Sequence, residues 1–186
     1  MLGDVDCGSF KLTTTQIADF AAGFVAGFTN HDDKADFESC YKESSTFDKD
    51  ICTLVTDFAS KDTKKIISGA EFILHNLPQL IGDLSACPDN VQSDIKVTED
   101  WGKSWESKGE LRIIHAARKN VKAHMDDIKQ EADQMISYYN QNDWFDTAKM
   151  AAEIAQIALP VAGKEDEEEE LELDNHCKDG YDLTNE

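Results

Sequence analysis

Apolar residues in the first part of the chain recur at every third or fourth position, which places them on one side of a helix. The three threonines at residues 13–15 are of a type that caps the start of a helix. Gly23 and Gly27 lie four residues apart in this segment, and we interpret them as positions of close helix packing in a core. The apolar positions of this first predicted helix are Ile17, Phe20, Ala21, Phe24, Val25 and Phe28.

The same spacing continues along the chain and predicts further helices. Segment 114–139 has the longest single apolar stripe and is predicted as one unbroken helix. Pro78 is expected to end or kink its helix, and Pro160 to stop the last one, because proline lacks the N–H that a helix needs. The predicted helices after the first lie near residues 33–41, 51–58, 62–77, 91–107, 114–139 and 144–158.

No run of alternating apolar and polar residues is long enough to predict a strand. We therefore predict an all-α fold, a compact bundle of six or seven helices with an acidic C-terminal tail. A weak repeat at an offset of 81 residues pairs Asp62 with Asp143 and Ala70 with Ala151. Two similar helical hairpins around one core would produce this repeat, and so would a chance alignment of two amphipathic hairpins.

The charge is concentrated toward the C-terminal end. The 186 residues carry 38 Asp and Glu against 18 Lys and Arg, a net charge of −20. Residues 164–186 contribute −9 of this, which leaves −11 for the preceding 163 residues. A run of like charges repels itself and stays solvated. We therefore divide the chain into an N-terminal segment at 1–12, a helical domain at 13–163 and an acidic tail at 164–186.

This composition argues against several classes of protein. A pI near 4.4 does not suit binding to nucleic acid through its phosphates, or to anionic membrane surfaces. No apolar run reaches the length of about 18 residues that a membrane-spanning helix needs. We predict no nucleic-acid partner and no membrane span.

Five cysteines are present, and none belongs to a Cys-x-x-Cys pair, so zinc-ribbon and thioredoxin-type sites are poorly supported. A bond between Cys40 and Cys87 would close a loop of nearly 50 residues and contribute on the order of 3–4 kcal/mol. Five reduced thiols in a cytosolic protein are the alternative. Cys7 and Cys177 lie near the two ends and could pair with each other or with neighbouring copies. Cys52 has no assigned partner.

Motifs for catalysis are weak. The sequence contains no Glu-x-x-His, no His-Glu-x-x-His, no glycine-rich phosphate loop and no Gly-x-Ser-x-Gly elbow. Glu71 and His75 lie four residues apart on a predicted helix, a spacing too common to indicate a metal site. We predict that the protein is not an enzyme and has no cofactor and no structural metal.

The acidic tail is the one candidate for binding a cation. Residues 175–186 match an EF-hand loop only at Asp179, Gly180 and Glu186, and no exiting helix can follow within this sequence. The run of carboxylates at 165–170 is predicted to bind calcium weakly, because clustered carboxylates attract hard cations.

The first half of the chain carries a loose pattern of features. A Gly- and Phe-rich helix at 20–28 precedes Cys40, a predicted helical hairpin follows, and Cys87 closes the block. Over roughly residues 17–158 the chain resembles a large, lineage-expanded family of small secreted helical proteins of ciliates. The resemblance implies a Cys40–Cys87 disulfide and an export signal missing from this chain. It brings no catalytic residues, because the family has no assigned activity, and Cys52 and the acidic tail depart from its pattern.

These features predict a non-enzymatic structural or interaction protein, located outside the cell or in the secretory lumen. Its expected partner is a second copy or another protein, in an extracellular assembly or filament. The most basic stretches that the acidic tail could meet are Lys64, Lys65 and residues 112–122. One alternative is an acidic calcium- or cation-binding module of the secretory lumen. Another is a carrier of a small lipid or apolar ligand in the Phe-rich interior.

Overall fold

The Gly- and Phe-rich segment forms helix α1 (Thr14–Thr29), whose start is fixed by a capping box. The Gln16 backbone N–H donates to Thr13 Oγ1 at 3.1 Å, and the Thr13 N–H donates to Gln16 Oε1 at 2.8 Å. The helix ends at Asn30, whose φ of 61° places it in the left-handed conformation common at helix ends. The capping signal and the apolar stripe thus produce the predicted first helix.

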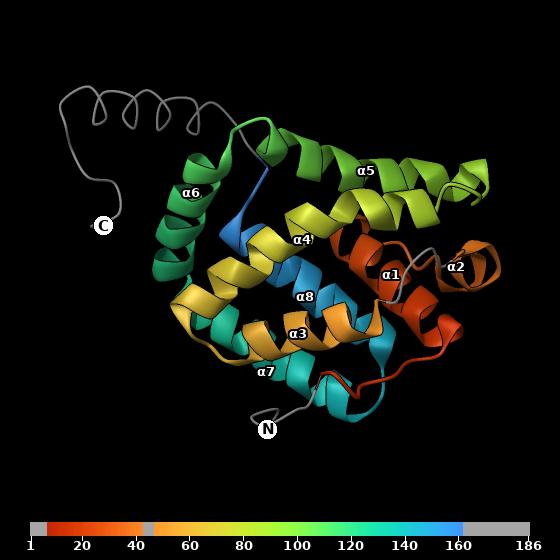
Figure 1. Ribbon diagram of the computed structural model, residues 1–186, viewed down its shortest axis with the longest axis horizontal. Coiled ribbons are helices and arrows are strands. Elements are labelled where there is room, and N and C mark those ends of the chain that lie inside the picture. The colour runs from red at the N-terminus through yellow and green to blue at the C-terminus, as the bar shows by residue number, and fades with distance from the viewer. Residues whose placement is uncertain (1–6, 43–46, 162–186) are drawn as a thin grey trace.

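Seven more helices follow in the part of the chain that the structure, a computed structural model, describes, which is residues 7–42 and 47–161 (Figure 1). They are α2 (Lys34–Cys40), α3 (Asp48–Ala59), α4 (Thr63–Asp83), α5 (Asp89–Glu106), α6 (Glu110–Ala123), α7 (Met125–Asn140) and α8 (Trp144–Ala158). These residues contain no strand. The predicted all-α bundle is confirmed, with eight helices in the described residues rather than six or seven.

Helix α8 runs through the middle of the bundle, and its closest partner is α1 (Figure 1). A Cβ built on Gly23 would lie 1.9 Å from the backbone oxygen of Phe145, and one on Gly27 would lie 2.5 Å from the Cβ of Ala152. Only glycine allows α1 and α8 to approach so closely, so the interpretation of these two glycines is confirmed. None of the helices in the described residues is long and apolar enough to cross a membrane.

The C-terminal end of α8 is held by side chains of α5 and α6. The carbonyls at the end of a helix have no partners within the helix. Here the carbonyl of Ala158, the last residue of α8, and those of the next two residues accept hydrogen bonds from side chains. The bonds are Trp101 Nε1 to Leu159 O at 2.6 Å, Trp105 Nε1 to Pro160 O at 2.8 Å and Asn120 Nδ2 to Ala158 O at 3.0 Å. The predicted stop at Pro160 is confirmed, and these bonds fix the place where the chain leaves the bundle.

The predicted unbroken helix at 114–139 is wrong, because two helices, α6 and α7, meet at His124. The backbone of His124 has φ −121° and ψ 25°, which is outside the helical range. The break lets each half bury its own stripe against different neighbours. Helix α6 packs on α4 and α8, whereas α7 packs on α8 and α3. The extra helix in the count comes from this break.

Pro78 does not end α4, which continues to Asp83. Proline removes one backbone donor and one hydrogen bond, but the residues beyond it are apolar and bury surface if the helix goes on. Leu80 and Ile81 pack against the core, and Leu84 is fully buried directly after the helix. The energy of this burial keeps the last turn helical.

The two hairpins α3–α4 and α7–α8 share the geometry of their turns. Lys61 and Asn142, which lie 81 residues apart, both have a φ of 58°. The next residue in each turn caps the following helix: Asp62 accepts from the Lys65 N–H at 3.2 Å, and Asp143 accepts from the Asp146 N–H at 3.0 Å. The offset is the same as in the sequence repeat, so the two hairpins are similar in structure as well as in pattern.

Candidate functional site

The structure pairs Cys40 with Cys87, as the resemblance implies. Their Cα atoms lie 4.9 Å apart, and the bond closes a loop of sequence separation 47. It joins the end of α2 to the turn that follows α4. The hairpin α3–α4 is thereby held to the helix that precedes it.

Cys7 is bonded to Cys52 of α3, with Cα atoms 5.5 Å apart. Of the partners that the sequence left open for Cys7, neither Cys177 nor a neighbouring copy is therefore the one it has in the structure. The reason is the course of the N-terminal segment, in which Phe10 stacks on Tyr139 and meets Trp144 edge-on. These contacts hold the segment against α7 and α8, beside α3. Cys177 lies outside the described residues, as does the carboxylate run at 165–170 for which calcium binding is predicted.

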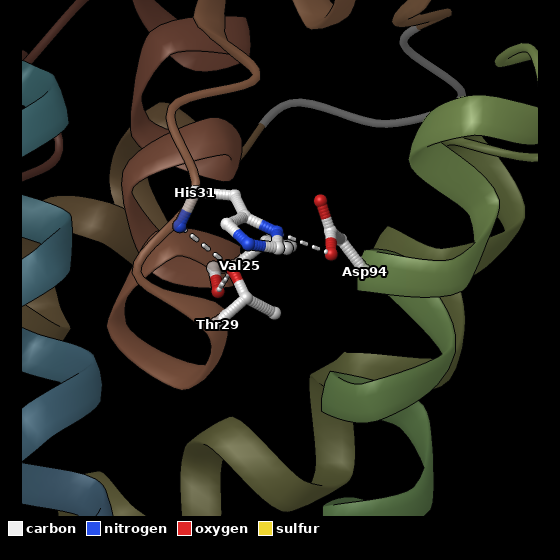
Figure 2. A network of polar contacts seen from close by, with 4 residues as sticks. All are labelled: Val25, Thr29, His31 and Asp94. Carbon is white, nitrogen blue, oxygen red and sulfur yellow. Dashed lines mark hydrogen bonds and ion pairs between the residues drawn. The ribbon is translucent and has the colours of Figure 1, made fainter.

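A histidine links the loop after α1 to helix α5, as Figure 2 shows. His31 Nδ1 lies 2.9 Å from Asp94 Oδ1, and the His31 backbone N–H donates to Thr29 Oγ1 at 3.2 Å. The Asp94 side chain is only 12% exposed. The hydrogen bond to Asp94, with the charge of that carboxylate, raises the pKa of His31 above its usual 6.5.

Asp33 joins this cluster from the start of α2. Burial, together with a hydrogen bond to Asp94, raises the pKa of the Asp33 carboxyl to about 6. The cluster therefore holds two carboxyls and an imidazole whose charges depend on one another. It ties α1, α2 and α5 together at one end of the bundle.

Replacing Asp94 with asparagine is expected to lower the pKa of His31, because the charged hydrogen-bond acceptor is lost. An NMR titration of the histidine ring protons measures this directly. Asp127→Asn is the matched control, since that carboxylate lies 3.8 Å from the ring of another histidine, His124. A His31 pKa that stays the same in Asp94→Asn would contradict the link.

Pairs of carboxyl groups meet at other helix junctions. Burial and a hydrogen bond to Glu38 raise the pKa of Asp19 to about 7, at the contact of α1 with α2. Burial and a hydrogen bond to Glu153 raise the pKa of Glu131 to about 7, at the contact of α7 with α8. Each pair is partly withdrawn from water, so both carboxyls cannot easily be charged at once. Among the described residues, no group of three or more His, Cys, Asp or Glu side chains is placed to hold a metal ion.

These pairs predict a fold that is more stable in mild acid. The pKa of Glu131 is about 7 in the folded protein against 4.5 for the free group. Between these two pH values the folded state therefore binds more protons than the unfolded state. This contribution is fully present below the lower value and is lost as the pH rises through about 7. Glu131→Gln removes the titration and is expected to raise the free energy of unfolding by about 1 kcal/mol at about pH 8, after allowance for solvent screening, and to change it little at about pH 5.

Urea unfolding at a series of pH values measures this effect. Asp126→Asn, an exposed carboxylate on the same helix, is the control and should leave the pH dependence as it is in the parent. If Glu131→Gln and the parent had parallel stability profiles, the raised pKa of Glu131 would be refuted.

Two concave regions stand out on the described surface. The first is an apolar pocket of about 70 Å³ between α1, α3 and α4. Asp50 and Asn76 are its polar members, and burial raises the pKa of Asp50. Its apolar side chains include Phe20, Phe24, Phe47, Leu54, Phe72 and Leu80.

The second concave region is a groove between α4, α5 and α6, and it brings Glu71 and His75 next to Glu106 and Glu110. The sequence pattern showed the first two residues on one helix face. It gave no sign of the other two, because they reach the groove only through the turn between α5 and α6.

No protein-family model, no curated protein and no solved structure matches this chain. The resemblance to the ciliate family stays a prediction.

Proposed function

We propose that this chain is a secreted, non-enzymatic structural or interaction protein that acts as a subunit of an extracellular assembly. The observation that carries the proposal is the pair of disulfides, Cys7–Cys52 and Cys40–Cys87. Disulfides persist in oxidising compartments and are rare in the cytosol. Both bonds lie within one chain, and they hold the N-terminal segment and α2 to the hairpin α3–α4.

The surface of the bundle supports a role in contacts with other molecules. Leu111 is 61% exposed in the first turn of α6, and Val161 is 71% exposed. Val161 follows Pro160, whose carbonyl is held by Trp105 near the end of α5. These two of the three exposed large apolar side chains thus belong to the end of the bundle where α5 gives way to α6, whereas the third, Val97, lies within α5. Exposed apolar groups in one region favour association.

Mass spectrometry of the unreduced full chain, combined with light scattering over a range of concentrations, tests this proposal. We expect the two intramolecular disulfides and an average mass that rises with concentration. Five free thiols would refute the proposal that the protein is secreted. A monomer at every concentration, with and without calcium, would refute the proposal that it assembles. Association that persists with a calcium chelator would exclude a calcium-bridged assembly.

The apolar pocket between α1, α3 and α4 favours a second candidate, a carrier of a small apolar ligand. The Asp50 carboxyl at the pocket would accept a hydrogen bond from an alcohol and repel a carboxylate. Calorimetry should therefore show propanol, which is small enough for this pocket, binding more tightly than propanoate. Filling the pocket by Leu54→Trp should abolish propanol binding without loss of helical circular dichroism, and equal binding by the parent and this variant would refute the carrier.

A further inference from the structure

The groove between α4, α5 and α6 consists of two adjoining cavities of about 340 and 210 Å³. Leu74, Pro78 and Glu106 line both of them, so the two adjoin along α4, and together they are called the channel. Ile113 of α6 closes the floor at one end, and Ile81 of α4 lies at the other. The floor is apolar, although it lies at the surface of a strongly acidic protein.

The course of the backbone explains why the channel is open. Gly109 has a φ of 89°, a conformation that side-chain-bearing residues rarely adopt, and it turns the chain from α5 into α6. Helix α6 therefore leaves at a steep angle to α5 (Figure 1). The larger cavity lies where α4 faces the end of α5 and the start of α6. At the other end, Gly102 lets Leu77 sink against α5, since a Cβ there would lie 2.5 Å from Leu77 Cδ2.

Carboxylates from three separate elements surround the floor. Glu71 comes from α4, Glu106 from the end of α5 and Glu110 from the first turn of α6. Burial, and then the negative charge of Glu110, raises the pKa of Glu71, while His75 partly offsets this. The other basic side chain that lines the channel, Lys103, lies 3.4 Å from Glu99 on its own helix. A positively charged ligand would relieve the repulsion between the carboxylates.

We propose that this channel binds a positively charged amphipathic helix of a partner protein. The inference rests on the proposed function as an interaction protein and names the chemistry of its partner. The apolar floor contains a row of residues spaced four and three apart along α4, namely Leu74, Pro78 and Ile81. This row is about 10 Å long, which matches two turns of the apolar face of a bound helix. Lys and Arg beside that face would meet Glu71, Glu106 and Glu110. A second copy is a poorer occupant of the channel, because its acidic surface would bring more carboxylates to Glu71, Glu106 and Glu110, so the self-association proposed above would use another surface.

The test uses the full, oxidised chain and a fluorescein-labelled peptide of about 14 residues with Leu and Lys in helical spacing, long enough to form a helix in the channel. A second peptide has Glu in place of every Lys, and a third has the same Leu and Lys in an order without an apolar face. Fluorescence anisotropy at about 150 mM salt, where exposed charges are largely screened, measures affinity. We expect the amphipathic Lys peptide to bind at least roughly tenfold more tightly than either of the others.

The variant Glu71→Gln/Glu106→Gln/Glu110→Gln removes the rim charge and is expected to weaken binding roughly tenfold. Leu74→Gln replaces an apolar group of the floor and is expected to weaken binding by a similar factor. Circular dichroism and thermal unfolding of each variant establish that it is folded. Hydrogen exchange should show slower exchange along residues 71–81 and 106–113 when the peptide is bound.

The matched control is Asp89→Asn/Asp100→Asn/Asp126→Asn, which removes the same number of charges at exposed positions outside the channel. Its affinity for the Lys peptide should stay within about twofold of the parent. Equal losses in the two triple variants, or equal binding of the peptide without an apolar face, would refute the channel and indicate attraction by net charge alone. A failed peptide test beside concentration-dependent association would refute the channel and leave the proposed function standing. Peptide binding by a chain that stays monomeric would support the channel and refute the proposed assembly.

Discussion

Replacing Gly23 with alanine is expected to lower the free energy of unfolding by about 3 kcal/mol, at the upper end of what overpacking of a core costs. The added methyl group would lie 1.9 Å from the carbonyl oxygen of Phe145, far inside the contact distance of real atoms. The obstacle is backbone rather than the end of a flexible side chain. It cannot rotate away, so α1 and α8 would have to separate.

Separation of these two helices affects the whole bundle, because the contact between α1 and α8 is the most extensive in the described chain. The buried residues around Gly23 lose close packing when the helices move apart, and packing losses add to the steric cost. The neighbouring site Gly27 meets the Cβ of Ala152 at 2.5 Å and should respond in the same direction. A smaller loss is expected there, since the overlap is smaller, with the nearest atom at 2.5 Å instead of 1.9 Å.

Urea unfolding followed by circular dichroism measures the loss. Gly82→Ala is the matched control, because Gly82 lies near the end of α4 and a Cβ there meets nothing within 4 Å. Alanine is a better helix former, so the control should gain about 0.5–1 kcal/mol. If Gly23→Ala were as stable as Gly82→Ala, the close packing of α1 on α8 would be disproved.

The sequence was sufficient for the elements whose stability is local. The apolar stripe and the threonine cap predict α1, and the turn residues before Asp62 and Asp143 lie at the offset of the sequence repeat. Capping and amphipathic spacing act within a few residues, so they can be recognised without knowledge of the rest of the fold.

The break at His124 could not be predicted in this way. The apolar positions Val121, Met125 and Ile128 keep helical spacing across it, so the pattern contains no interruption. The break depends on what each half meets, since α6 and α7 are buried against different helices. The periodicity of apolar residues indicates which side of a helix is buried, but it does not show where the helix axis changes direction.

The Cys7–Cys52 bond and the channel on α4 were missed for a related reason. Cys7 lies in a segment without helical spacing, and the packing of Phe10 on Tyr139 helps to bring it to α3. Glu106 and Glu110 meet Glu71 because of one turn at Gly109. Contacts between residues far apart in the sequence follow from the completed fold, and a single sequence holds little information about them.

Removing the Cys40–Cys87 disulfide by Cys40→Ser/Cys87→Ser is expected to lower the free energy of unfolding by about 4 kcal/mol. The bond closes a loop of sequence separation 47. Without it the unfolded chain has a higher conformational entropy, which stabilises the unfolded state. Removing Cys7–Cys52, of separation 45, should cost nearly the same by this reasoning. Urea unfolding of the parent and the two double variants compares the free energies directly.

The two bonds should differ in what their loss does to the folded state. Cys40 and Cys87 are both buried, and Gln92 also donates to the Cys87 carbonyl at 2.9 Å, so the surroundings of this bond should stay in place without it. Cys7 is part of the segment that precedes α1, so loss of its bond should speed hydrogen exchange at residues 7–12 and expose Trp144, which Phe10 meets edge-on, to a fluorescence quencher. Equal stability of the parent and both variants would contradict the disulfides themselves. Equal exchange at residues 7–12 in the two variants would contradict only the tethering role of Cys7.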